Sequence, residues 1–220
     1  LYVIWLDSIP GIAGHLLAAS IMSAPASLVV AKIIYPETEI SSKKSFIKVH
    51  ISEKDENIMD ALARGASDGL KLAANVGAML IAFVSIITMV NYIFSFFFSY
   101  TLQELIGLVL KPLAWTMGVP WSEAKIVGIL MGEKIVLTEL IAYSNLSEII
   151  KKEFISERTS IIASYALCGF ANFSSIGIQL GGIGAMAPKR KKDLSKIAFK
   201  AMIGGALASW LTATIAGILI

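Results

Sequence analysis

A single carboxylate, Glu139, follows a polar interruption at residues 132–134 in the apolar segment formed by residues 126–131 and 135–137. An acidic side chain in apolar surroundings commonly marks the pathway of a substrate or ion. A carboxylate can accept hydrogen bonds from two hydroxyl groups, so Glu139 is a candidate for directional recognition of a vicinal diol. The alternative is a hairpin carboxylate that reaches water, and the motif described below favours recognition.

A second polar cluster, formed by Asn172, Ser174 and Ser175, lies in the middle of the apolar residues 159–188. Five glycines interrupt the same stretch, which makes a continuous helix unfavourable. An unwound centre would free backbone groups beside these side chains, as in the midplane binding sites of transporters. Asn and Ser also join transmembrane helices by hydrogen bonds, but the glycines favour the cavity-lining alternative.

The polar residues indicate no covalent chemistry. The sequence contains no nucleophile and base arrangement, no spacing typical of metal ligands and no glycine-rich phosphate loop after a strand. Cys168 is the only cysteine, which excludes a disulfide within the chain and a thiolate metal site. We therefore expect no enzyme activity, no catalytic residue, no metal site and no cofactor.

The composition places much of the chain in lipid. Of its 220 residues 56% are hydrophobic and 16% are charged, whereas soluble domains are about a quarter charged. Four apolar segments reach the roughly 20 residues that a membrane-spanning helix needs: 8–31, 72–103, 159–188 and 201–220. The net charge of +3 comes from residues at segment ends, which indicates topology and no nucleic-acid partner. The predicted fold class is an all-α polytopic membrane protein.

Six segments follow from the apolar spans and their interruptions. We expect a helix and a polar loop in residues 1–56, with the helix ending at Tyr35-Pro36 because proline disfavours helix at the preceding residue. The remaining five are a long tilted helix (57–100), an interfacial amphipathic helix (101–120), a re-entrant hairpin (121–156), a broken transmembrane helix (157–188), and a basic loop with the last transmembrane helix (189–220).

Basic residues set the expected orientation. The basic loops at residues 43–44 and 189–192 come out on one face, which the positive-inside rule makes cytoplasmic. The hairpin then enters from the outer side of the cytoplasmic membrane. Lys134 either anchors the hairpin tip or snorkels toward water, and snorkelling is favoured. Because the sequence opens at Leu1 without a methionine or a signal peptide, we expect the natural chain to continue upstream.

Three parts of the sequence resemble the concentrative nucleoside transporter family. Residues 132–143 (GEKIVLTELIAY) are similar to the family motif G-x-K-x-x-x-N-E-F-V-A-Y, and residues 166–178 (ALCGFANFSSIGI) match the family's broken helix. The pair formed by residues 22–26 and 75–83 completes the resemblance, which extends over essentially the whole chain in the family's order. The departures are Thr138, Leu140 and Ile141, which leave the acid in place and change the packing of the tip.

The resemblance implies an inverted-repeat transporter built as a homotrimer, in which a transport domain moves against a fixed scaffold. This chain would hold the second repeat and the end of the first. The hairpin of the first repeat would lie outside it. The implied substrate is a nucleoside, driven by Na⁺ or H⁺, with membrane lipid as the other partner.

The resemblance also assigns the binding residues. Glu139, Asn172 and Ser175 would form hydrogen bonds with ribose hydroxyls, Phe170 would line an apolar wall, and Leu80 would contact the nucleobase. Two alternatives remain open. One is a transporter for another polyol or for a nucleobase, and the other is a non-transporting membrane interaction subunit in which the polar centre only packs helices.

Overall fold

The computed structural model describes residues 1–37, 57–98, 100–186 and 188–220, and every element in these ranges is helical. This confirms the all-α class. The elements are α1 Tyr2–Trp5, α2 Ile12–Ile34, α3 Ile58–Phe98, α4 Leu102–Thr116, α5 Ala124–Val136, α6 Glu139–Lys151, α7 Glu157–Leu167, α8 Phe173–Met186, the 3-10 turn Pro188–Arg190, and α9 Lys191–Leu219. The polar loop expected after α2 falls largely in residues 38–56, outside the described ranges.

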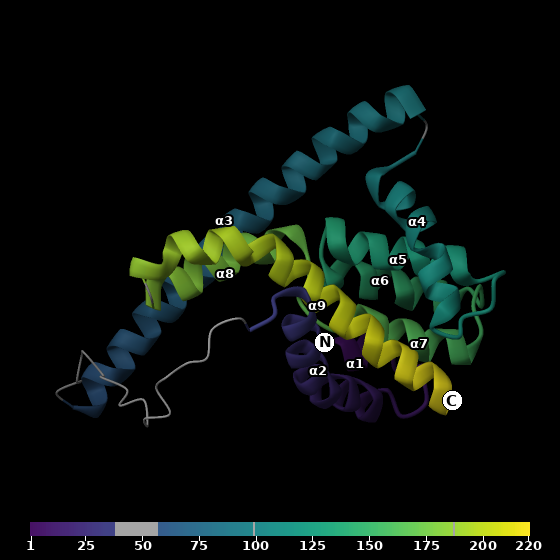
Figure 1. Ribbon diagram of the computed structural model, residues 1–220, viewed down its shortest axis with the longest axis horizontal. Coiled ribbons are helices and arrows are strands. Elements are labelled where there is room, and N and C mark those ends of the chain that lie inside the picture. The colour runs from purple at the N-terminus through teal and green to yellow at the C-terminus, as the bar shows by residue number, and fades with distance from the viewer. Residues whose placement is uncertain (38–56, 99, 187) are drawn as a thin grey trace.

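Helix α3 stands apart from the other helices. It crosses the molecule diagonally and projects beyond α4 to α9 at both ends (Figure 1). Its main contacts are with α8 and, near its C-terminal end, with α4. Large apolar side chains such as Leu70, Ile81 and Phe96 are exposed along it. An apolar surface of this kind is typical of a helix that contacts lipid or another protein surface.

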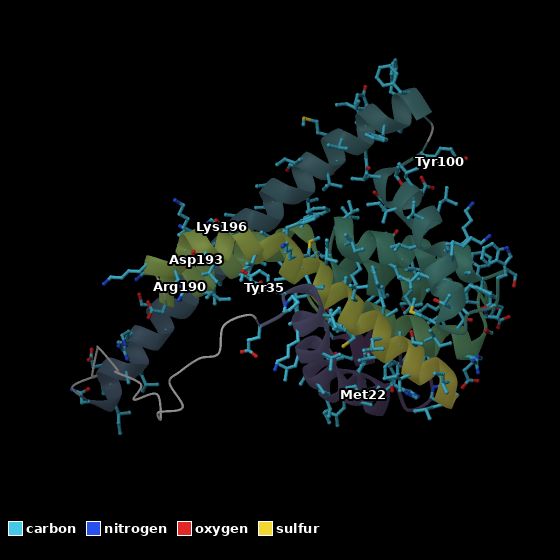
Figure 2. The ribbon with its side chains drawn as sticks, in the orientation of Figure 1. Met22, Tyr35, Tyr100, Arg190, Asp193 and Lys196 are labelled. Atoms are coloured by element: carbon cyan, nitrogen blue, oxygen red, sulfur yellow. The ribbon has the colours of Figure 1, made fainter. Side chains whose placement is uncertain are left out.

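Helices α2 and α9 are the two unbroken helices, among the described residues, that are long and apolar enough to cross a membrane. The segments Val84–Phe97 and Leu102–Thr116, which meet at 83°, pass the same test only if they are counted as one span. Helix α2 ends at Ile34, directly before Tyr35-Pro36, as the proline predicts. It packs on α9, where Tyr35, labelled in Figure 2, lies with its ring centroid 5.7 Å from the Lys200 ammonium.

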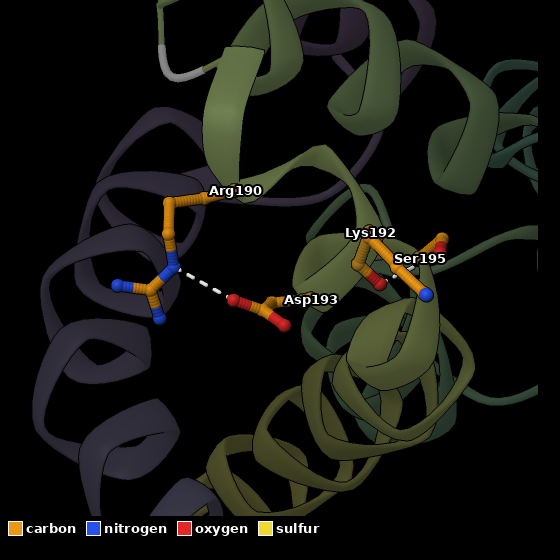
Figure 3. A network of polar contacts seen from close by, with 4 residues as sticks. All are labelled: Arg190, Lys192, Asp193 and Ser195. Carbon is orange, nitrogen blue, oxygen red and sulfur yellow. Dashed lines mark hydrogen bonds and ion pairs between the residues drawn. The ribbon is translucent and has the colours of Figure 1, made fainter.

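The prediction of a basic loop that extends up to the last apolar span at residue 201 is wrong, because residues 191–200 already belong to the last helix. After the 3-10 turn, α9 begins at Lys191 and continues unbroken to Leu219. At this start Asp193, in the first turn, accepts a 2.8 Å hydrogen bond from Nε of Arg190 (Figure 3). An acidic residue in the first turn also complements the positive end of the helix. The charges around residue 191 mark a solvated surface, and lysine is a good helix former.

Glycines bring α4 and α5 into close contact. A Cβ atom at Gly128 would overlap the carbonyl oxygen of Gly107, and one at Gly107 would lie 2.6 Å from Cα of Ile129. Gly132 meets Gln103 in the same way, one turn further along α5. Small residues allow such backbone contact between helices where lipid gives no hydrophobic drive to associate. The α4–α5 contact therefore holds the first arm of the α5–α6 hairpin in place.

Replacing Gly128 with Ala is expected to destabilise the protein by about 1–3 kcal/mol, because the added methyl group overpacks a backbone contact. The measurement is the thermal melting temperature of the purified protein in detergent. Gly182→Ala in α8 is the matched control, since a Cβ at Gly182 meets nothing within 4 Å. An unchanged melting temperature for Gly128→Ala would contradict the close packing of α4 on α5.

Candidate functional site

The tip of the α5–α6 hairpin places a carboxylate at a helix start. Helix α5 ends at Val136, and Leu137 leaves the helical conformation. Thr138 is extended, and its hydroxyl oxygen accepts a hydrogen bond of 3.4 Å from the Ile141 amide, so it caps α6. Thr and Asn both serve as N-cap residues, which explains why Thr138 fits this position. Glu139 is the first residue of α6, where the helix dipole favours a negative charge.

A second break separates α7 from α8. Helix α7 ends at Leu167, and Gly169 adopts φ +111°, a conformation that favours glycine. Asn172 then starts α8: its Oδ1 atom accepts hydrogen bonds of 2.7 Å from both the Ser175 amide and the Ser174 hydroxyl. The Ser175 hydroxyl donates in return to the Asn172 carbonyl at 2.6 Å. These bonds fix the side chain of Asn172.

The two breaks meet at Glu139. Nδ2 of Asn172 donates to Oε2 of Glu139 at 3.0 Å, and the Tyr2 hydroxyl donates to Oε1 at 3.4 Å. Glu139 is 4% exposed and Asn172 is 2% exposed. Each carboxylate oxygen has two lone pairs, so both oxygens of Glu139 retain capacity for a further donor.

A cavity of about 380 Å³ opens beside this pair. Its size lies within the range of small-molecule sites, which are mostly apolar with a few polar groups. The walls come from α1, α3, α8, the hairpin tip and the α7–α8 break. They are formed by Tyr2, Val84, Thr138, Glu139, Leu140, Ile141, Phe170, Asn172, Ser174 and Ile178.

Three of the five predicted site residues, Glu139, Asn172 and Phe170, line this cavity. Phe170 is 69% exposed, so its ring belongs to the cavity rim. Ser175 is buried and does not line the cavity, and its hydroxyl donates to the Asn172 carbonyl. Leu80 lies in α3, and its side chain is outside the described residues. Val84, one helical turn after Leu80, is the α3 residue on the cavity wall.

Tyr2 is a wall residue that the sequence did not indicate. Its ring stacks on Tyr143 of α6, with centroids 4.4 Å apart, and the Tyr143 hydroxyl donates to the Ser164 carbonyl at 2.7 Å. This chain of contacts ties α1, α6 and α7 together beside Glu139. The only local sign was an aromatic residue in a segment too short to span. Ser174 was part of the predicted polar cluster but was not assigned to the wall.

The favoured prediction for Lys134 is wrong. Its side chain is 0% exposed and does not reach water. The ammonium group donates to the Ala166 carbonyl at 3.0 Å and to the Ser209 hydroxyl at 2.7 Å. Snorkelling requires a path to the membrane surface, and the packing of α7 on α5, together with Ser209 of α9 at the ammonium, closes that path.

Within the described residues, no group of three or more His, Cys, Asp or Glu side chains gathers as metal ligands do. The carboxylate and amide at the centre of the site are instead hydrogen-bonded to each other and to Tyr2. What the arrangement offers is hydrogen-bond recognition of a molecule that has both polar groups and apolar parts.

Comparison with known proteins agrees with this chemistry. Residues 15–217 match a family described as Na⁺ dependent nucleoside transporter C-terminus. The nucleoside permease NupC of Helicobacter pylori is 41% identical over 94% of this chain and 51% of its own length. The sodium/nucleoside cotransporter 1 of Mus musculus is 40% identical over 94% of this chain and 35% of its own length.

Solved structures of a related protein, CNTnw, are also similar to this chain. The structure of CNTnw in an inward-facing substrate-bound state is 43% identical, with a TM-score of 0.75 over 93% of this chain and 50% of that one. A variant of CNTnw in an intermediate state superposes with a TM-score of 0.82, at 43% identity, over 93% of this chain and 51% of that one. The chain thus spans about half the length of these solved structures and of NupC, and less of the cotransporter.

Proposed function

Because the chain belongs to the family of Na⁺ dependent nucleoside transporters, we propose that the protein imports nucleosides across the cytoplasmic membrane together with Na⁺. Family membership confirms the resemblance found in the sequence, and the named relatives are a permease and a cotransporter, not enzymes. The observation that carries the proposal is the buried Glu139–Asn172 pair in the wall of an otherwise apolar cavity.

The ribose would bind at the polar end of the cavity. Glu139 accepts from two sugar hydroxyls with the lone pairs that Asn172 and Tyr2 leave open. Such charge-assisted hydrogen bonds are about twice as strong as neutral ones. Forming both bonds with one carboxylate requires a ligand with two neighbouring hydroxyl groups. Ser175 belongs to the site through Asn172, whose side chain its amide holds in place.

The nucleobase would bind at the apolar end. Val84 and Ile178 line the cavity, and Phe170 at the rim supplies an aromatic face. Leu80, one turn before Val84 on α3, is proposed as a further contact on this side. Apolar walls of this kind hold a planar base without reading its polar edge, so we expect the site to accept more than one base.

The arrangement of the helices favours a moving transport domain. Helix α3 contacts the remainder mainly through α8, and we propose that it belongs to the fixed scaffold of a homotrimer. The hairpin α5–α6 would enter the membrane without crossing it, and α7–α8 would cross as one broken span. Non-helical backbone is tolerated at membrane depth where it lines a cavity, as both breaks do here.

Na⁺ is proposed as the coupling ion because the family description and the cotransporter relatives name it. The test is uptake of labelled uridine and adenosine into proteoliposomes that contain the protein as the cell makes it. A tenfold inward Na⁺ gradient, coupled one to one, should accumulate nucleoside up to about tenfold, since both gradients correspond to about 1.4 kcal/mol. An equal K⁺ gradient should give no accumulation. Accumulation driven by a proton gradient alone would identify H⁺ as the coupling ion.

Competition separates the remaining alternatives. Free ribose and free nucleobase should compete weakly with uridine, because each occupies one end of the cavity. Competition by uracil as strong as that by uridine would identify a nucleobase carrier. The absence of both uptake and nucleoside binding would identify an interaction subunit and would contradict the proposal.

A further inference from the structure

Lys134 carries a positive charge in the most enclosed part of the hairpin. It is 0% exposed, and its ammonium donates to the carbonyls of Ala166 at 3.0 Å and Cys168 at 3.4 Å and to the Ser209 hydroxyl at 2.7 Å. An ammonium has three hydrogen-bond donors, and here three acceptors surround it. None of the ion pairs among the described residues involves Lys134. The groups in direct contact with the charge are therefore neutral oxygen atoms.

Two of these oxygens belong to the end of a helix. Helix α7 stops at Leu167, so its last carbonyls have no partner within the helix. The same carbonyls form the negative end of the helix dipole, where a cation is favourable. In transporters, the C-terminal ends of half-helices are positions where coupling cations bind. Here a side chain of the hairpin fills the position.

The hairpin tip thus matches both ends of the break. On one arm, Lys134 presents a cation to the negative C-terminal end of α7. On the other arm, Glu139 presents an anion to Asn172, at the positive N-terminal end of α8. Two contacts of opposite charge fix the register of two segments more firmly than one contact does.

We propose that Lys134 is a tethered cation that caps α7 and fixes the α7–α8 break so that Asn172 faces Glu139. Lys134 does not line the cavity, so it is a positioning residue and touches no substrate. Its effect on substrate rests on the proposed nucleoside binding, but its effect on the break does not. The two effects can be measured separately.

The decisive variant is Lys134→Ala, which leaves the oxygens of Ala166, Cys168 and Ser209 facing an empty space of the removed side chain's size. Loss of hydrogen bonds to a charged group should weaken uridine binding about tenfold to a hundredfold. Adding n-propylammonium should restore much of the affinity, because it returns an ammonium and three carbons to the space. Tetramethylammonium has no N–H donor and should restore nothing. Lys134→Met fills the space with apolar atoms, so its affinity for uridine should stay low with either ammonium compound.

A second measurement reports on the break without any nucleoside. Cys168 is the only cysteine of the chain and lies at the start of the break. Its rate of maleimide labelling, mapped by mass spectrometry in the intact protein, should rise about tenfold or more in Lys134→Ala and fall again with n-propylammonium. The milder Ser209→Ala, which removes one acceptor and keeps both carbonyls, should give smaller changes of the same sign.

The outcomes separate this inference from the proposed function. If the parent protein binds no nucleoside, the proposed function fails, and amine-dependent labelling of Cys168 still decides on Lys134. If the parent binds uridine and Lys134→Ala binds it equally well, with unchanged labelling, the inference is overturned. A lower melting temperature that neither amine corrects, with unchanged affinity and labelling, would also overturn it, since Lys134 would then only fill the core.

Discussion

Replacing Glu139 with Gln is expected to lower the affinity for ribonucleosides by about one to two orders of magnitude while the protein still folds. Gln keeps one acceptor oxygen for Asn172 and replaces the other with an amide donor, which the Tyr2 hydroxyl can accept. A diol that donates two hydrogen bonds to the carboxylate loses one of them and meets a mismatched donor. Hydrogen bonds to charged groups contribute about 1.5–3 kcal/mol, which sets the expected loss.

Deoxynucleosides make this prediction specific. 2′-Deoxyuridine and 3′-deoxyuridine each lack one of the two hydroxyls that contact Glu139, so both should bind the parent more weakly than uridine and lose less on substitution. Binding is measured by calorimetry in detergent and by counterflow in proteoliposomes. Glu133→Gln is the matched control, because Glu133 lies on the same hairpin, accepts from Asn145 at 2.9 Å and does not line the cavity. Equal losses for uridine and both deoxynucleosides would mean that Glu139 is a structural carboxylate.

Local signals in the sequence predicted two of the helix ends. Proline after Tyr35 ends α2, and glycine with Asn172 marks the gap after Leu167. The polar residues 132–134, expected to interrupt the hairpin, lie inside α5, which continues to Val136. Each of the two correct signals acts through the backbone of its own residue or through hydrogen bonds within three residues, as the capping by Asn172 shows. Such effects can be inferred from neighbouring residues alone.

Contacts between distant segments could not be predicted in this way. The hydroxyl of Tyr2 reaches Glu139 across 137 positions, and the ammonium of Lys134 reaches Ser209 across 75. The sequence shows each of these residues beside apolar neighbours and does not show its partner. For Lys134 the rule that charges seek water gave the wrong answer, because three oxygen acceptors replace water in the interior.

The prediction of where α9 starts failed for a different reason. Charged residues around Lys191 indicate contact with water, and the prediction equated that contact with a loop. Solvation and backbone conformation are separate properties, since lysine and glutamate are good helix formers. The pairing of Arg190 with Asp193 within one turn was the local sign of a helix start.

Replacing Asn172 with Asp should destabilise the protein by about 2–4 kcal/mol at neutral pH and abolish measurable nucleoside binding. Asp keeps the acceptor for Ser174 and Ser175 but places a second carboxylate oxygen about 3.0 Å from Oε2 of Glu139. Two like charges at this distance repel by several kcal/mol near a protein surface, unless one of them takes up a proton.

The folded variant therefore binds more protons than its unfolded state, so its stability should fall as pH rises and recover as pH is lowered toward 5. The melting temperature across pH 5–8 measures this. Asn145→Asp is the matched control: it sets a carboxylate against the half-buried Glu133, outside the cavity, and should cost less stability without affecting nucleoside binding.

The double variant Glu139→Gln with Asn172→Asp separates packing from recognition. Its Gln amide can donate to the new Asp carboxylate, so the hydrogen bond between the two breaks returns with its direction reversed and with one charge in place of two. We expect the melting temperature to return close to that of the parent. Nucleoside affinity should stay as low as in Glu139→Gln, because the Asp oxygens are occupied by Ser174, Ser175 and the Gln amide. If Asn172→Asp alone is as stable as the parent at every pH, Asn172 and Glu139 do not face each other, and the proposed ribose site is wrong.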